Sequence, residues 1–159
     1  MSGLMNEAGL LDTQNIVNEV EDVFPRALQL IGDATRTGAV LTIVGVSEES
    51  LFELRCMLGT APADKRAKYW AFSMEKAQRL LAHPNHDSSF ESRNEAELQY
   101  GGAVRAQTCI ISLSGLPEKW DEAVTLVLAC RTGVMDEKKA GLIAQANQNP
   151  HFKELLQEV

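Results

Sequence analysis

The chain has 159 residues, of which 45% are hydrophobic and 23% are charged, and its formal net charge is −7. These values are typical of one globular domain with an ordinary hydrophobic core. The negative charge argues against a nucleic-acid partner, because phosphate binding needs a basic face. No apolar run approaches the roughly 18 residues of a membrane span, so we expect no membrane partner.

The N-terminal part predicts one loose segment followed by a helix. Residues 1–11 lack the basic and apolar regions of a secretory signal, which favours a cytoplasmic location. Asp12 or Thr13 can cap a helix whose apolar residues recur with a helical period. Pro25 is expected to kink this helix or to begin a second one, and Gly38 is a natural stop.

A hairpin and a long helix are predicted next. Residues 39–46 are nearly all apolar and rich in β-branched side chains, as in an interior strand. Residues 51–57 alternate as a half-exposed strand does, and residues 47–50 form the turn between the two. A helix is then expected over residues 62–82, with an apolar stripe facing the core. This stripe contains Ala67, Trp70, Met74, Ala77 and Leu81.

Two histidines lie in the polar loop that follows. His83 and His86 are three residues apart, and Pro84 between them favours a turn over a helix. A metal needs more ligands than this loop supplies, so no metal site is predicted. A heme needs only one axial ligand, and either histidine could provide it.

The stretch from Tyr100 to Val127 contains the strongest motif. A Gly pair precedes a strand that ends at Ser114, Gly115 begins a break, and a helix follows Pro117. Unpaired N–H groups in the first turn of that helix could hold an anion. The alternative is a well-capped helix that binds nothing. Acidic residues in this turn interact favourably with the helix dipole, which explains their presence without any catalytic role.

Residues 134–159 predict a helical C-terminal extension, interrupted at Asn149 and Pro150. Its last turns carry one apolar stripe. This extension could cover the sheet locally or pack against a neighbouring subunit.

The ordered motifs GGA, strand, SGLP and an acidic helix start resemble the GlcG/HbpS-like (heme-degrading-domain) family, including its branch of small proteins of unassigned function. The resemblance implies one domain over residues 12–133 with a profilin-like α+β fold, an antiparallel sheet with helices packed on it. It also implies a homo-oligomer, and some relatives bind heme or another tetrapyrrole.

The resemblance also implies a set of ligand-binding candidates. These are Lys76, Gly101, Gly102, Ser114, Gly115 and Asp121. Two departures from the family pattern weaken a heme site: the segment after the Gly pair is short and begins Val104-Arg105, and the first helix has no histidine.

These observations favour a module that binds a small molecule, such as a tetrapyrrole or another anion. The alternatives are a structural or assembly protein acting through protein contacts, and a small enzyme acting on an organic metabolite. No catalytic constellation is apparent, because no serine or cysteine is framed by a base and no phosphate-binding glycine loop occurs.

Overall fold

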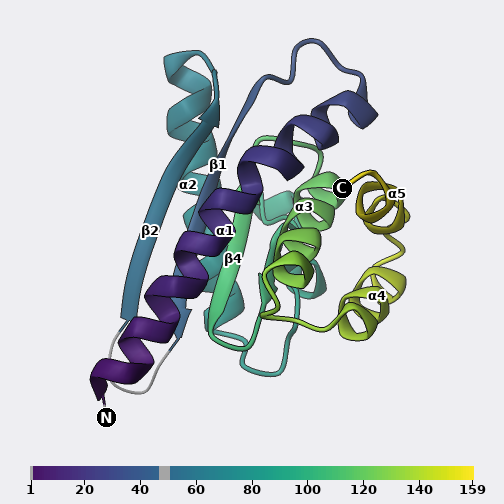
Figure 1. Cartoon of the computed structure of the whole chain (residues 1–159). Coiled ribbons are helices and arrows are strands. Elements are labelled where there is room, and N and C mark those ends of the chain that lie inside the picture. The colour runs from purple at the N-terminus through teal and green to yellow at the C-terminus, as the bar shows by residue number, and fades with distance from the viewer. Residues whose placement is uncertain (1, 47–50) are drawn as a thin grey trace.

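A four-stranded antiparallel sheet in the order β2-β1-β4-β3 forms the centre of the computed structural model, which describes residues 2–46 and 51–159 (Figure 1). The strands are β1 (Gly38–Val46), β2 (Leu51–Gly59), β3 (Ala103–Arg105) and β4 (Cys109–Ser114). The helices are α1 (Ser2–Ile31), α2 (Ala63–Leu81), α3 (Glu118–Arg131), α4 (Glu137–Ala146) and α5 (His151–Glu158), with short 3-10 turns at Ser89–Ser92 and Glu95–Glu97.

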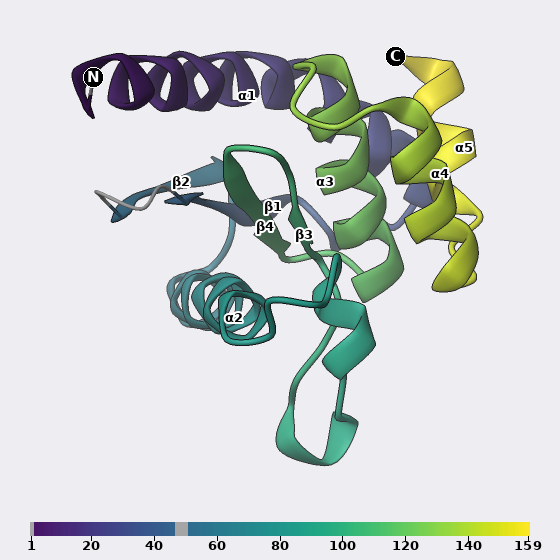
Figure 2. The same cartoon turned by 90° about the horizontal axis from the view of Figure 1, so that it is seen from below.

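The helices form layers on both faces of this sheet. Figure 2 shows α1 and α3 over one face, α2 over the other, and α4 and α5 outside α3. The main core lies between the sheet and the α1–α3 layer, and a smaller cluster around Leu80 lies under α2. The predicted α+β class, an antiparallel sheet with helices packed on it in a single domain, is confirmed. No helix in the described ranges is long and apolar enough to cross a membrane.

The predicted hairpin is confirmed, because β1 pairs with β2 in antiparallel register from Gly38↔Gly59 to Val46↔Leu51. The predicted turn at residues 47–50 lies outside the described residues. Strand β1 is central and buried over eight of its nine residues, as its apolar sequence predicts.

Helix α1 differs from its prediction at both ends and in the middle. It begins at Ser2, so residues 2–11 are helical and not a loose segment. Leucine, methionine, alanine and glutamate there are strong helix formers, and no proline interrupts them. The helix continues through Pro25. Proline has no N–H to donate to the carbonyl four residues earlier, but Pro25 is exposed, so water can hydrate that carbonyl. The helix ends at Ile31, seven residues before the predicted stop at Gly38. At this end the Gly32 N–H donates to the Leu28 carbonyl at 3.1 Å.

Helix α2 has the predicted bounds, but its buried face is rotated from the predicted stripe. The buried residues of α2 are Ser73, Lys76, Ala77, Arg79 and Leu80. Trp70 is 43% exposed and Ala67 is exposed, because the N-terminal turns of α2 lie outside the core. The guanidinium of Arg55 lies over the Trp70 ring, 5.2 Å from its centroid.

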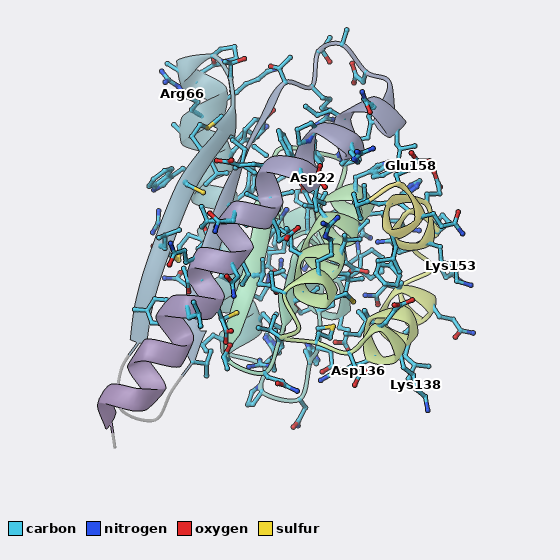
Figure 3. The ribbon with its side chains drawn as sticks, viewed as in Figure 1. Asp22, Arg66, Asp136, Lys138, Lys153 and Glu158 are labelled. Atoms are coloured by element: carbon cyan, nitrogen blue, oxygen red, sulfur yellow. The ribbon has the colours of Figure 1, made fainter. Side chains whose placement is uncertain are left out.

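The C-terminal helices pack on α3 of their own chain, and Lys138 and Lys153 on these helices point away from it (Figure 3). The His151 ring stacks on Trp120 at 4.1 Å between centroids. Glu122, fully buried on α3, accepts hydrogen bonds from Ser88 Oγ at 2.8 Å and from Asn147 Nδ2 at 2.9 Å. Burial raises the pKa of the Glu122 carboxyl, and these hydrogen bonds partly offset the rise. The extension is therefore joined to the domain by both packing and buried polar contacts.

Candidate functional site

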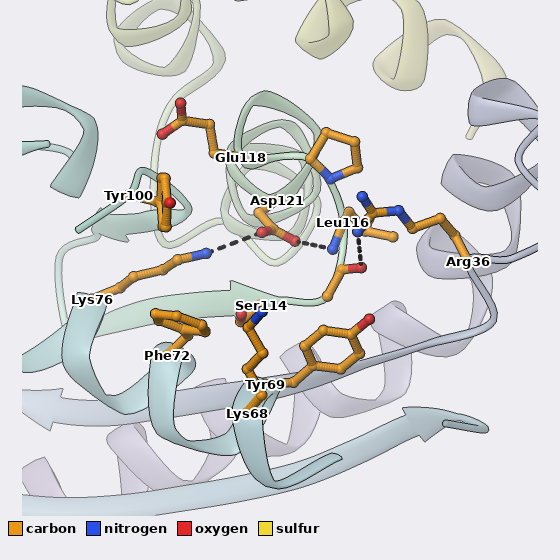
Figure 4. A pocket seen from close by; sticks show the side chains of 12 residues that line it. Arg36, Lys68, Tyr69, Phe72, Lys76, Tyr100, Ser114, Leu116, Glu118 and Asp121 are labelled. Atoms are coloured by element: carbon orange, nitrogen blue, oxygen red, sulfur yellow. Dashed lines mark hydrogen bonds and ion pairs between the residues drawn. The ribbon is translucent and has the colours of Figure 1, made fainter. Parts of the chain in front are cut away.

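A pocket of about 440 Å³ lies beside the SGLP turn, between α2, the loop after α1 and the start of α3 (Figure 4). Its size is within the range of small-molecule sites. Three aromatic side chains and five charged ones take part in its lining. The lining residues are Arg36, Lys68, Tyr69, Phe72, Lys76, Tyr100, Ser114, Gly115, Leu116, Pro117, Glu118 and Asp121.

A buried ion pair lines the inner side of this pocket. Lys76 Nζ lies 3.0 Å from Asp121 Oδ2 and donates to the Leu113 carbonyl at 2.8 Å. The two side chains are only 3% and 2% exposed. Burial raises the pKa of Asp121 to about 7, and the Lys76 ammonium and the Leu116 N–H limit that rise. Burying an ion pair costs desolvation free energy, so this pair is a feature of the site that apolar packing would not require.

The SGLP turn is held in place by the same carboxylate. Asp121 Oδ1 accepts the Leu116 N–H at 3.0 Å, and Arg36 Nη1 donates to the Gly115 carbonyl at 2.8 Å. The Leu116 N–H, which precedes the helix, is thus bound by the chain's own Asp121. No side chain caps α3 at Pro117, so the predicted anion site at the first turn of the helix stays a prediction.

Glu118 occupies the other side of the helix start. Its Oε2 accepts the Gly101 N–H at 2.9 Å, and its carboxylate pairs with the Arg93 guanidinium. Desolvation would raise the pKa of Glu118, but the hydrogen bonds from Arg93 and Gly101 lower it overall. Both carboxylates of the pocket are therefore already paired with cations.

The Gly pair lies directly behind the ion pair. Gly102 has φ +131°, and a Cβ built there would lie 2.8 Å from Lys76 Nζ and 2.9 Å from Asp121 Cβ. A side chain at this position would displace the lysine, so the glycine makes room for the pair. Gly101 contributes its N–H to Glu118 and packs against Phe90. Neither glycine lines the pocket itself.

Four of the six residues carried over from the family motif therefore meet at this pocket, namely Lys76, Ser114, Gly115 and Asp121. The other two, Gly101 and Gly102, support it from behind. The motif residues at the pocket come from α2, β4, the turn after β4 and α3, and the fold brings them together.

We expect Gly115→Ala to lower the free energy of unfolding by about 1 kcal/mol or more. Gly115 has φ +143°, and a Cβ there would lie 2.6 Å from the Gly38 carbonyl oxygen and 2.7 Å from the Ala39 Cα. Urea unfolding measures the change, with Gly141→Ala in α4 as the control, because no atom lies within 4 Å of a Cβ at Gly141. A Gly115→Ala variant as stable as the wild type would contradict this account of the turn.

The two candidate heme ligands lie elsewhere. His83 and His86 follow the C-terminal end of α2, where their rings stack at 4.8 Å between centroids. His83 Nδ1 is 2.7 Å from the Arg79 carbonyl oxygen, and neither histidine lines the pocket. The pocket lining contains no histidine, cysteine or methionine, so its residues do not fit a histidine-ligated heme. No cluster of metal-binding side chains occurs in the described part of the chain.

Several lining residues were not found from the sequence. Lys68 and Phe72 precede Lys76 by eight and four residues, so all three lie along one side of α2. This spacing is a signal that could have identified them once Lys76 was a candidate. Arg36 and Tyr100 come from loops, and no local pattern points to Arg36.

The unpaired charge of the pocket is positive. Lys68 has no carboxylate partner within ion-pair distance among the described residues, and its Nζ lies 5.8 Å from the Phe72 ring centroid. Arg36 lies 3.7 Å from the exposed Asp33, whose pKa is lowered mainly by hydrogen bonds from Thr35. With Asp121 and Glu118 paired internally, Lys68 remains to attract an anion, and Arg36 adds a second cation whose partner Asp33 is exposed and outside the pocket lining.

Comparisons of the chain with family models, with curated proteins and with solved structures gave no match. The assignment of a function therefore depends on the geometry of the pocket.

Proposed function

We propose that the chain binds a small organic anion with a flat, aromatic body in the pocket beside the SGLP turn. The observation that carries this proposal is the combination of aromatic walls with internally paired carboxylates. Tyr69, Phe72 and Tyr100 offer apolar ring surface, while Lys68 and Arg36 offer positive charge. The amine that lies beside a carboxylate in the pocket lining, Lys76 next to Asp121, is held in a buried ion pair and by the Leu113 carbonyl, so binding explains these residues better than catalysis does.

A tetrapyrrole held by its propionates is one member of this ligand class. The pocket cations would contact the carboxylates, and the pocket offers no histidine to a bound iron. The proposal therefore covers a tetrapyrrole as an organic anion and assigns no heme chemistry to it.

The test uses anilinonaphthalene sulfonate, a flat aromatic anion whose fluorescence rises in apolar sites. We expect Lys68→Glu to weaken its binding about tenfold or more, because a charge-assisted contact contributes about 1.5–3 kcal/mol and 1.4 kcal/mol corresponds to a factor of ten. Lys138→Glu is the matched control, since Lys138 is an exposed lysine on α4 that does not line the pocket. Phenylnaphthylamine, which has the same rings without the sulfonate, should bind the wild type more weakly.

Equal effects of the two lysine changes, or equal binding of the neutral and charged probes, would disprove an anion site in this pocket. Hemin titration on the same variants tests the tetrapyrrole. A Soret band that is lost in His83→Ala/His86→Ala but retained in Lys68→Glu would place heme at the histidines and away from the pocket.

A further inference from the structure

The two edges of the sheet are built differently. At one edge, β3 has only three residues, and its outer side is covered by the loop before it. Arg105 N–H donates to the Asp87 carbonyl at 2.8 Å, and Ser88 forms a bridge with Val104. At the other edge, β2 has nine residues, and β1 is its one strand neighbour in the described part of the chain. Figure 1 shows β2 as the outermost strand.

An open edge of this length offers a row of unpaired N–H and C=O groups to another strand. Proteins usually protect such an edge with proline, lysine, a bulge or a covering segment. Strand β2 contains neither proline nor lysine, and its register with β1 is uninterrupted along its whole length. Its two charged residues have opposite signs, so the edge carries no net charge that would repel a second copy.

The two charged residues of β2 have opposite signs and lie on the same face, where Arg55 Nε donates to Glu53 Oε1 within the chain. Glu53 and Arg55 are two residues apart, and Arg55 lies over Trp70 on the α2 side. The other face of β2 packs toward the main core through half-buried Leu54 and Cys56. One face of the strand is thus apolar, and the other carries one positive and one negative charge.

We propose that β2 pairs antiparallel with β2 of a second copy of this chain, about a two-fold axis that passes through Leu54 normal to the sheet. In this register Glu53 lies opposite the partner's Arg55, and Arg55 lies opposite the partner's Glu53. Leu54 lies opposite the partner's Leu54 on the apolar face. An axis through Glu53 or Arg55 would place like charges directly opposite each other, which destabilises a strand pair.

The pairing joins the two four-stranded sheets into one continuous sheet and removes the open edge from both copies. Because residues 52–58 do not line the pocket beside the SGLP turn, dimerisation and ligand binding are separate properties. A failure of either one leaves the other intact.

Charge reversal tests the pairing in the full-length protein. Light scattering and sedimentation should give the wild type twice the monomer mass of 17.4 kDa. Glu53→Arg alone or Arg55→Glu alone places like charges opposite each other at two positions, so each variant should be monomeric where the wild type is dimeric. The double reversal, Glu53→Arg with Arg55→Glu, restores opposite charges across the axis and should restore the dimer.

Circular dichroism and thermal melting of each variant separate loss of the dimer from loss of the fold. A wild type of monomer mass, single reversals that remain dimeric, or a folded double reversal that stays monomeric would each overturn the proposal.

Cross-linking tests the register directly. In a Cys56→Ser background, Leu54→Cys should be joined to the partner by a short bifunctional maleimide. Leu58→Cys in the same background should not, because residues 58 of the two copies would lie eight residues apart, about 27 Å at 3.4 Å per residue. The Cys56→Ser protein alone controls for Cys109 and Cys130. Cross-linking at residue 58 but not at residue 54 would overturn the register.

Discussion

Replacing Lys76 with methionine should lower the free energy of unfolding by about 3–5 kcal/mol at a pH near 8. The change removes the cation that lies 3.0 Å from Asp121 and leaves that carboxylate buried and unpaired. Methionine fills much of the same volume, so the loss reports the charge more than a cavity. Urea unfolding followed by circular dichroism measures it.

The effect of Lys76→Met should depend on pH. Burial places the pKa of Asp121 at about 7 in the folded wild type, above its ordinary value of 3.8. A folded pKa that is raised means that the folded state binds the proton more tightly, so this group's contribution to stability is lost as pH rises between these values. Without Lys76 the folded pKa rises further. We therefore expect the difference between variant and wild type to be smaller near pH 5, where Asp121 is protonated in both.

Two further variants separate the ion pair from general damage. Lys138→Met changes an exposed lysine and should leave stability within about 0.5 kcal/mol. Adding Asp121→Asn to Lys76→Met removes the unpaired charge and should recover part of the loss. If Lys76→Met were no less stable than Lys138→Met, the buried pair would contribute nothing to the fold.

The elements of the fold could be predicted from local sequence patterns. The apolar run of β1, the alternation of β2 and the helix after Pro62 all have periods that sequence alone reveals. The full length of helix α1 could not be predicted in this way, because proline usually interrupts a helix. Pro25 is accommodated within α1 because it is exposed in the folded chain.

The buried face of α2 could not be predicted from periodicity, because polar residues form part of it. Ser73 Oγ donates to Thr42 Oγ1 at 2.7 Å, and Ser112 Oγ donates to the Ser73 carbonyl at 2.7 Å. Each partner lies at least 31 residues away in the sequence. A prediction that places all polar residues on the exposed side therefore assigns the wrong face of this helix to the core.

The candidate site was predictable only in part, for the same reason. The motif identified Lys76 and Asp121 separately, but a helical lysine is usually exposed, and nothing in the sequence joins two residues that lie 45 positions apart. The pocket is made by the loop that carries Arg36 approaching the Gly115 turn, a contact between residues 79 positions apart.

The C-terminal extension was predicted either to cover its own chain or to pack on a neighbour, and Phe152 distinguishes these roles. Phe152 is 2% exposed within a single chain and belongs to the main core. We expect Phe152→Ala to lower the free energy of unfolding by about 3–5 kcal/mol, because a large buried ring is replaced by a cavity. Leu142→Ala in α4 is the control, since Leu142 is 57% exposed and its loss should change stability by no more than about 0.5 kcal/mol.

The concentration dependence of the Phe152→Ala effect then decides between the two roles. If α5 covers its own α3, the loss in stability is a property of one chain and should be equal at low and high protein concentration. If α5 instead packed on a neighbouring subunit, the variant would lower the oligomer mass, and its effect on unfolding would grow with concentration. The stacking of His151 on Trp120 and the bond from Asn147 to Glu122 within the chain predict the first result.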